Sequence, residues 1–111
     1  MNKKISIITV VKNGMPFLKS AIKSFNLQKY DNKELIIVYA PSKDGTEEYL
    51  KSLNYPDIII KKDFESTTKF GSINLGIKIS SGVIVGLLHS DDVFFNEKIL
   101  NQITEKFNED I

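Results

Sequence analysis

Four short runs rich in β-branched residues constrain the fold of this chain more than any other feature of its sequence. The runs cover residues 5–11, 35–39, 58–60 and 83–88. Each run is almost continuously apolar, whereas a strand with one face in water alternates apolar and polar residues. The continuous pattern is typical of strands that are buried on both faces of a parallel sheet. The sequence therefore predicts four buried strands.

Helical spacing and helix-end residues follow each of these runs. Pro16 stands in the first turn of the first expected helix, where its missing N–H costs nothing, and Gly82 ends the third. Asp44 and Glu47 have the spacing of a capping box at the start of the second. The order βαβαβαβα predicts an α/β, Rossmann-like domain with a central, mostly parallel sheet of four strands and helices on both faces. The expected helices cover residues 15–27, 44–55, 70–80 and a last segment that begins at Asn96.

The spacing of apolar residues also predicts which face of three helices packs inward. These side chains should cover the sheet and form the core with it. They are Leu18, Ala21, Ile22 and Phe25 in the first helix, Phe70, Ile73 and Ile77 in the third, and Ile99, Leu100, Ile103 and Phe107 in the last.

The composition limits the classes of function. The chain has 111 residues, 41% of them hydrophobic and 26% charged, which suits a single packed domain over residues 1–111. The absence of cysteine excludes disulfides, thiolate metal sites and cysteine nucleophiles. A net charge of +1 gives no overall field that would attract nucleic acid, so no nucleic-acid partner is expected. All 15 basic residues are lysine, so an anionic ligand must be held by lysine, backbone amides or a metal ion.

The apolar run that begins at Ile5 follows two lysines, as in a signal peptide. Lys12 interrupts it after Val11, and no small-residue cleavage site follows it. No run reaches the roughly 20 residues that span a bilayer. We therefore expect no transmembrane segment and a cytoplasmic location, which includes the inner face of the plasma membrane.

The residues after the last apolar run are the first candidates for chemistry, because ligands of open parallel sheets bind beyond the carboxyl ends of the strands. His89, Ser90, Asp91 and Asp92 stand there. Adjacent carboxylates repel each other and are costly to desolvate, so the pair favours either a divalent cation shared with substrate phosphates or a cap at a strand-to-helix turn. His89, the single histidine, is open to the roles of metal ligand, proton carrier and packed or substrate-lining residue.

Three common alternatives lack their motifs. Residues 14–20 contain the lysine and serine of a Walker A loop but not its second glycine. A dinucleotide fingerprint needs three spaced glycines after the first strand, and only Gly14 is present. A phospho-receiver domain would have an acidic pair where this chain has Lys12 and Asn13.

Four motifs in the same order and spacing resemble the inverting glycosyltransferases of family 2, which have the GT-A nucleotide-diphosphate-sugar fold. The resemblance covers almost the whole chain. It implies a GT-A half-domain that binds a nucleotide sugar and forms the amino-terminal portion of a longer glycosyltransferase. The motifs are residues 6–14 (SIITVVKNG), 35–38 leading into 42–46 (SKDGT), 74–78 (NLGIK) before Gly82, and 87–92 (LLHSDD).

The resemblance implies roles for residues near the strand ends. In the family, the segment over residues 9–13 lines the nucleobase pocket, and the acidic motif contacts the ribose and a divalent metal. Asp91 would contact both the ribose and the metal, and Asp92 would be the direct ligand of Mn²⁺ or Mg²⁺. That ion would neutralise the diphosphate in a chain without arginine. The residues of this chain in the nucleobase segment are Thr9, Val11, Lys12 and Asn13.

Tyr39 is the main departure from the family pattern, since the family has an acidic residue there that binds the base or ribose. Ala40 and Pro41 replace the small glycines that should follow. Tyrosine can stack or donate a hydrogen bond but carries no charge. This leaves the alternative of a degenerate or truncated nucleotide-sugar-binding module without transferase activity.

The implied reaction transfers a sugar from a nucleoside-diphosphate sugar, with a UDP-sugar as the first candidate, to a glycan or lipid-linked acceptor with inversion. In the family the catalytic base lies well beyond the acidic motif, so it is expected beyond Ile111 and no catalytic residue is named. A nucleotidyltransferase is a further alternative, but the chain has no glycine-rich loop with arginine after the first strand.

Overall fold

Eight elements alternate along the chain in the predicted order βαβαβαβα. The computed structural model describes residues 2–109. The first strand has the predicted bounds, and the other elements differ from the prediction by a few residues at their ends. The elements are β1 (Ile5–Val11), α1 (Phe17–Asn26), β2 (Lys33–Tyr39), α2 (Thr46–Lys51), β3 (Ile58–Lys62), α3 (Lys69–Ile79), β4 (Ile84–Leu87) and α4 (Ile99–Glu109).

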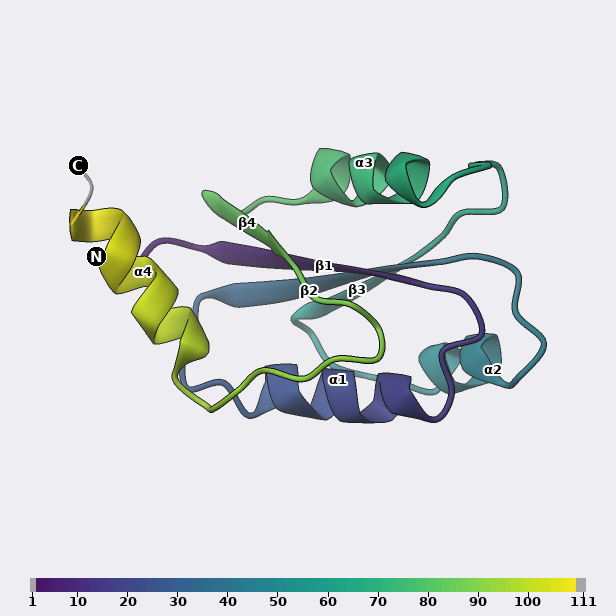
Figure 1. Ribbon diagram of the computed structural model, residues 1–111, viewed down its shortest axis with the longest axis horizontal. Helices are drawn as coiled ribbons and strands as arrows, with labels where there is room; N and C mark the ends of the chain where they lie inside the picture. Colours follow the sequence, from purple (N-terminus) through teal and green to yellow (C-terminus); the bar gives the residue numbers. More distant parts are fainter. Residues whose placement is uncertain (1, 110–111) are drawn as a thin grey trace.

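The strands form one sheet in the order β3-β2-β1-β4, and every neighbouring pair is parallel. Ile5 pairs with Lys33 on one side and with Ile84 on the other, so β1 is an inner strand. The chain leaves β3 at one edge and returns through α3 to β4 at the opposite edge (Figure 1). The strand order therefore reverses beside β1, and such a reversal is where ligands bind in sheets of this kind.

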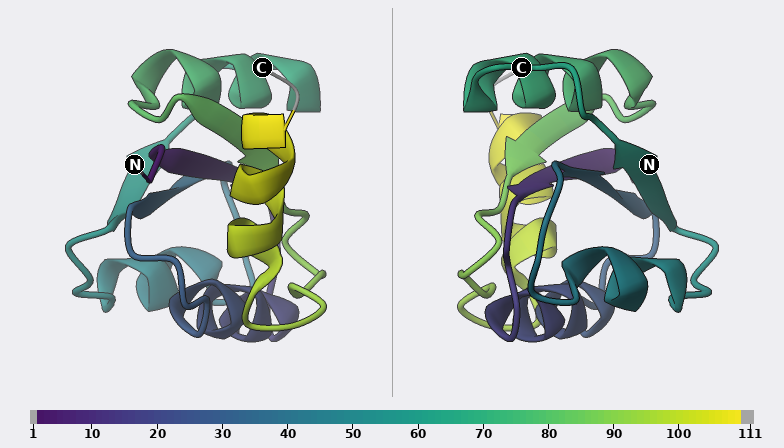
Figure 2. Two further views of the ribbon diagram at one scale, coloured as in Figure 1. Left: turned by 90° about the vertical axis from the view of Figure 1, so that its left-hand side faces the viewer. Right: turned by 90° about the vertical axis from the view of Figure 1, so that its right-hand side faces the viewer.

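Helices cover both faces of the sheet, as predicted. The end-on views show α1 and α2 on one face and α3 on the other (Figure 2). Leu18, Ala21, Ile22 and Phe25 of α1 are buried, which confirms the predicted inward face of that helix. They share the larger core with side chains of β1 and β2, including Ile7, Leu35 and Ile37.

The predicted inward face of α3 is wrong. Phe70 is 74% exposed, Ile77 is 47% exposed and Ile73 is only half-buried. The buried residues of α3 are the small Ser72 and Gly76. A Cβ atom at Gly76 would lie 2.7 Å from Cγ2 of Ile8 in β1, so the helix approaches the sheet too closely for large side chains between them.

The prediction that all four strands are buried on both faces is confirmed for β1 and β2 but is wrong for β3 and β4. The side chains of Ile59 in β3 and of Val85 in β4 are partly exposed, and Leu87 is 56% exposed. Both strands are at edges of the four-stranded sheet, where neighbours cover them on one side only. An apolar run alone does not distinguish an edge strand from an inner one.

Gly45, rather than Asp44, caps α2. Its φ of 92° lies in the left-handed region that favours glycine, and glycine has no side chain with which to cap the helix. Asp44 lies before the cap, where its carboxylate accepts the N–H of Thr46 at 3.1 Å and the N–H of Met15 in the loop after β1. Glu47 accepts a hydrogen bond from the Tyr39 hydroxyl. The predicted capping box is therefore wrong, because tertiary contacts engage both carboxylates.

α4 begins at Ile99, after the predicted start at Asn96, and it lies across the amino ends of the strands (Figure 1). Leu100 is buried as predicted, but Phe107 is half-exposed, contrary to the prediction. Thr104 is buried instead, and its hydroxyl donates to the Leu100 carbonyl. Among its described residues, α4 buries Leu100 and Thr104, whereas α1 buries four residues against the sheet.

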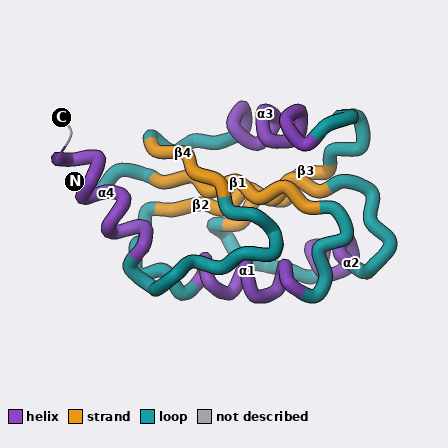
Figure 3. The backbone as a smooth tube through the Cα atoms, viewed as in Figure 1, coloured by secondary structure: helices purple, strands orange, loops and turns teal. Residues whose placement is uncertain are grey.

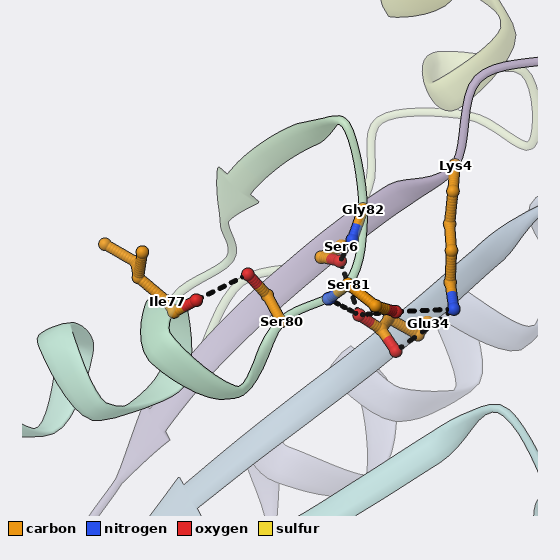
Figure 4. A network of polar contacts seen from close by, with 7 residues as sticks. All are labelled: Lys4, Ser6, Glu34, Ile77, Ser80, Ser81 and Gly82. Atoms are coloured by element: carbon orange, nitrogen blue, oxygen red, sulfur yellow. Dashed lines mark hydrogen bonds and ion pairs between the residues drawn. The ribbon is translucent and has the colours of Figure 1, made fainter.

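A buried carboxylate fastens the return from α3 to the sheet (Figure 4). Oε2 of Glu34 in β2 accepts hydrogen bonds from the Ser6 hydroxyl at 2.5 Å and from the Ser81 N–H at 2.8 Å. Lys4 forms an ion pair with Oε1 of Glu34 at 3.5 Å, and the Gly82 N–H donates to the Ser6 hydroxyl. This network joins β1, β2 and the α3–β4 connection.

The loops that follow β1, β2 and β3 lie together at one end of the molecule (Figure 3). This arrangement follows from the parallel pairing of the strands, which puts their carboxyl ends on one side. Within residues 2–109, none of the helices has the length and apolar character needed to cross a membrane.

Candidate functional site

A cavity of about 520 Å³ lies where β1, β2 and β3 end. Its volume falls within the roughly 300–1,000 Å³ of small-molecule sites. Two of the predicted nucleobase residues, Val11 and Lys12, line it. The complete lining is Val10, Val11, Lys12, Ala40, Pro41, Asp63, Phe64, Ser66, Thr67, Thr68, Lys69 and Ser72.

Asp63 organises the wall of this cavity between β3 and α3. One carboxylate oxygen accepts hydrogen bonds from the backbone N–H groups of Glu65 and Ser66, at 3.2 and 3.0 Å. The other accepts the Ser72 hydroxyl at 2.8 Å. Hydrogen bonds from the side chain and backbone of Ser66 and from Ser72 hold the pKa of Asp63 well below its ordinary value. Asp63 is therefore a charged carboxylate at the cavity wall at neutral pH.

Asn13 joins the loop after β1 to the loop after β2. Its backbone N–H donates to the Ser42 hydroxyl at 2.9 Å, and its side-chain oxygen accepts the N–H of Lys43 at 2.8 Å. Its φ of 51° is one that asparagine tolerates better than most residues. Asn13 does not line the cavity but fixes loops that do.

Asp44 and Thr46 strengthen this connection between the two loops. The Thr46 hydroxyl accepts the N–H of Gly14 at 2.9 Å and donates to Asp44 at 2.6 Å. The other oxygen of Asp44 accepts the N–H of Met15 at 2.9 Å. The hydrogen bond from Thr46 lowers the pKa of Asp44, and the bond from Met15 adds to this effect. The SKDGT motif thus has a structural purpose that its sequence does not disclose.

The acidic pair lies on the turn after β4. Asp91 and Asp92 are exposed, and the N–H of Asp92 donates to the carbonyl of His89 at 3.0 Å. The Nδ1 atom of His89 lies 3.3 Å from Nζ of Lys69, the first residue of α3. Because Lys69 also lines the cavity, it connects the cavity with the acidic turn.

Two predicted site residues point elsewhere. Thr9 is buried, does not line the cavity, and its hydroxyl has no hydrogen-bond partner. Tyr39 is also buried, and its hydroxyl donates to Glu47 at 2.9 Å. Burial raises the pKa of Tyr39, and the hydrogen bond to Glu47 raises it further. Its ring meets that of Phe64 edge-on at 6.0 Å, so Tyr39 supports the cavity wall from behind.

The acidic turn suits a divalent ion only in part. Residues 2–109 contain no group of three or more histidine, cysteine, aspartate or glutamate side chains that could hold a metal. Asp91 and Asp92 supply oxygen donors, which Mg²⁺ and Mn²⁺ prefer. A site with one or two carboxylates is completed by water and substrate phosphates. The pair therefore fits an ion that binds together with a phosphorylated ligand.

Prediction from the sequence missed Asp63, Phe64 and Lys69. Asp63 and Phe64 directly follow β3, in the position where a parallel sheet presents its ligands. That position was the available signal. Nothing in the sequence indicated that Lys69 lies within 3.3 Å of His89, because 20 residues separate them.

Comparison with known proteins identifies the family. Residues 6–110 match the model described as Glycosyl transferase family 2. An uncharacterized glycosyltransferase of Rickettsia prowazekii is 38% identical over 99 residues, which are 89% of this chain and 30% of that protein. A UDP-Glc:alpha-D-GlcNAc-diphosphoundecaprenol beta-1,3-glucosyltransferase of Escherichia coli is 31% identical over 99 residues, covering 89% of this chain and 39% of that protein. The chain spans less than two fifths of the length of either relative.

Solved structures share the fold. S. aureus TarS 1-349 in complex with UDP-GlcNAc has a TM-score of 0.85 and 21% identity, over 96% of this chain and 31% of that one. The mannosyltransferase PcManGT from Pyrobaculum calidifontis, in complex with GDP-Man and Mn²⁺, has a TM-score of 0.83 and 20% identity, over 94% of this chain and 32% of that one. These likenesses show the α/β, Rossmann-like GT-A fold. The family match over residues 6–110 establishes that this chain belongs to glycosyl transferase family 2.

Proposed function

We propose that this chain is the donor-binding part of a glycosyltransferase that moves a sugar from a nucleoside-diphosphate sugar to a glycan or lipid-linked acceptor with inversion. The observation that carries the proposal is the position of the 520 Å³ cavity, which Lys69 connects with the turn of Asp91 and Asp92. A nucleoside and a diphosphate need such a pair of neighbouring sites, one with apolar walls and one that binds charge.

The cavity supplies the features that a nucleoside needs. Phe64 presents an aromatic ring that is half-exposed, and Pro41 and Val10 add apolar surface. Ser66, Thr67 and Thr68 add polar residues to the wall. We assign the base to this cavity, with Val11 and Lys12 in contact with it and with Asn13 holding the loop. In this assignment Thr9 and Tyr39 support the cavity wall and do not contact the base.

A uridine nucleotide is the first candidate. The Escherichia coli relative is named for UDP-Glc, and TarS was solved with UDP-GlcNAc. PcManGT was solved with GDP-Man and Mn²⁺, so the same fold also accommodates a guanine nucleotide. These names support a nucleoside-diphosphate sugar as the ligand class. The titration described below identifies which nucleobase the chain prefers.

In the proposed reaction, an acceptor hydroxyl attacks the anomeric carbon of the donor. The new bond forms between this carbon and the acceptor oxygen, the bond to the diphosphate breaks, and the acceptor proton passes to a base outside residues 2–109. Asp91 and Asp92 would hold the divalent ion. When bound, that ion would neutralise charge on the departing nucleoside diphosphate.

Titration with nucleotides tests this function. Calorimetry with UDP, GDP and ADP, each with and without Mn²⁺, should show binding that strengthens with the metal, and we expect UDP to bind most tightly. A folded protein that binds none of the three under either condition would contradict the proposal. A preference for GDP would retain the ligand class and correct the base.

A second candidate, a nucleotide-sugar-binding module without transfer, rests on the uncharged Tyr39 at the position where the family has an acidic residue. This module would give the same titration but no sugar transfer in the full-length protein. The names of the relatives, which are glycosyltransferases, support the first candidate.

A further inference from the structure

Lys69 holds a position that no other lysine of the cavity shares. It lines the 520 Å³ cavity, and it also lines a smaller hollow whose wall includes Leu87, Leu88 and His89 at the end of β4. Lys12 is the other lysine of the cavity and directly follows β1. Lys69 therefore stands on the boundary between the cavity and the acidic turn.

His89 fixes the charged end of Lys69 at this boundary. Their nitrogen atoms are 3.3 Å apart, and an ammonium group can only donate, so Nδ1 of His89 accepts and its N–H is on Nε2. The carbonyl of His89 also accepts the N–H of Asp92 at 3.0 Å. The lysine is thereby attached to the turn that carries Asp91 and Asp92.

The charge of Lys69 is available to a ligand. Within residues 2–109, the ion pairs join Lys4 to Glu34, Lys29 to Glu97 and Lys51 to Glu47, and none involves Lys69. The chain contains no arginine, so phosphate binding by side-chain cations depends on lysine. A lysine acts on phosphate as a compact point charge.

We propose that Lys69 is the cation that binds the diphosphate of the donor, with His89 as its positioning residue. The inference rests on the proposed function. If the nucleoside occupies the cavity and its diphosphate reaches Asp91 and Asp92, the phosphates must lie between the cavity and the acidic turn. Lys69 lies on the wall between these two places. Lys69 thus recognises the phosphates and not the base.

The test compares UDP with uridine, which has the same base and no phosphate, in buffer containing EDTA so that no metal contributes. In Lys69→Met we expect UDP to bind at least tenfold more weakly while the affinity for uridine is unchanged. Lys69→Arg should recover most of the UDP affinity. Lys78→Met is the matched control on the same helix, outside both hollows, and should bind UDP as the wild type does.

Salt dependence and the second variant separate a phosphate contact from a structural role. The UDP affinity of the wild type should fall with added KCl more steeply than that of Lys69→Met, because one charge contact has been removed. His89→Ala should lower UDP affinity less than Lys69→Met and leave uridine binding unchanged. Unchanged UDP affinity in Lys69→Met, or an equal loss for UDP and uridine, would overturn the inference. Failure of the folded wild type to bind UDP, GDP or ADP, with or without Mn²⁺, would instead refute the proposed function.

Discussion

The side-chain oxygen of Asn13 accepts a hydrogen bond from the backbone N–H of Lys43, 2.8 Å away and 30 residues further along the chain. The N–H of Asn13 donates to Ser42 in the same loop. These contacts fix the loop after β1 against the loop after β2, and both loops contribute to the cavity wall through Lys12 and Pro41. The shape of the cavity thus depends on a residue that does not line it.

Two substitutions at Asn13 separate its hydrogen bond from its backbone conformation. Asn13→Gly removes the side-chain bond but tolerates the φ of 51°, and it should cost about 1 kcal/mol of unfolding free energy. Asn13→Ala adds the strain of a positive φ, so its cost should be about 1 kcal/mol larger. Urea denaturation of both variants measures this difference. Equal stability of the two variants would show that the conformation carries no strain.

Thr9 offers a direct choice between a structural and a ligand-binding role. Its buried hydroxyl has no partner, so Thr9→Val should leave the unfolding free energy unchanged or raise it by up to about 1 kcal/mol. UDP affinity should also be unchanged, because Thr9 does not line the cavity. Thermal denaturation and calorimetry provide the two measurements. A marked loss of UDP affinity at unchanged stability would place Thr9 in contact with the nucleotide.

Glu34 should make the fold sensitive to acid. Burial alone would raise the pKa of Glu34, but hydrogen bonds from Ser6 and Ser81 and the charge of Lys4 outweigh it and lower the pKa. A lowered pKa means that the stabilisation is present above the ordinary value, about 4.3, and is lost as the pH falls through that value and below. Unfolding free energies of the wild type should therefore decline below about pH 5.

Glu34→Gln tests this assignment. It should lower the unfolding free energy by about 1 kcal/mol or more at pH 7, since a buried charged acceptor is lost, and it should flatten the decline in acid. Glu48→Gln in α2 is the control, because Glu48 is exposed, and it should follow the wild-type curve. An acid decline in Glu34→Gln as steep as that of the wild type would assign the effect to other carboxylates.

Asp92→Ala should abolish the Mn²⁺-dependent part of UDP binding and leave the fold intact, because Asp92 is exposed on its turn. The remaining affinity should equal that of the wild type in EDTA. Calorimetry measures the binding, and circular dichroism with thermal denaturation checks the fold. Metal-dependent binding that survives in Asp92→Ala would identify Asp92 as a turn residue only.

The prediction of the fold from sequence worked best where local pattern and tertiary burial agree. β1 has the expected bounds because both of its faces are covered, so an uninterrupted apolar run coincides with the strand. The inward face of α3 could not be predicted from apolar spacing, because Gly76 and Ser72 let that helix approach the sheet closely. The spacing of Asp44 and Glu47 was misleading for a similar reason, since distant backbone and hydroxyl groups bind them.

The candidate site could be located from the sequence, but its construction could not. The rule that ligands bind beyond the carboxyl ends of parallel strands led to Lys12 and to the acidic pair. The contacts of Asn13 with Lys43 and of Lys69 with His89 join segments 20 or more residues apart, and only the folded chain brings them together.

The central claim is that a nucleoside diphosphate occupies the cavity at the carboxyl ends of β1 to β3 and extends to the acidic turn. Chemical-shift mapping of the backbone amides during a UDP titration tests it most directly. The claim predicts the largest shifts at residues 10–12, 63–72 and 89–92, with little change along α1 and α4. Shifts concentrated on α1 and α4, or no saturable shifts in a folded sample, would contradict it.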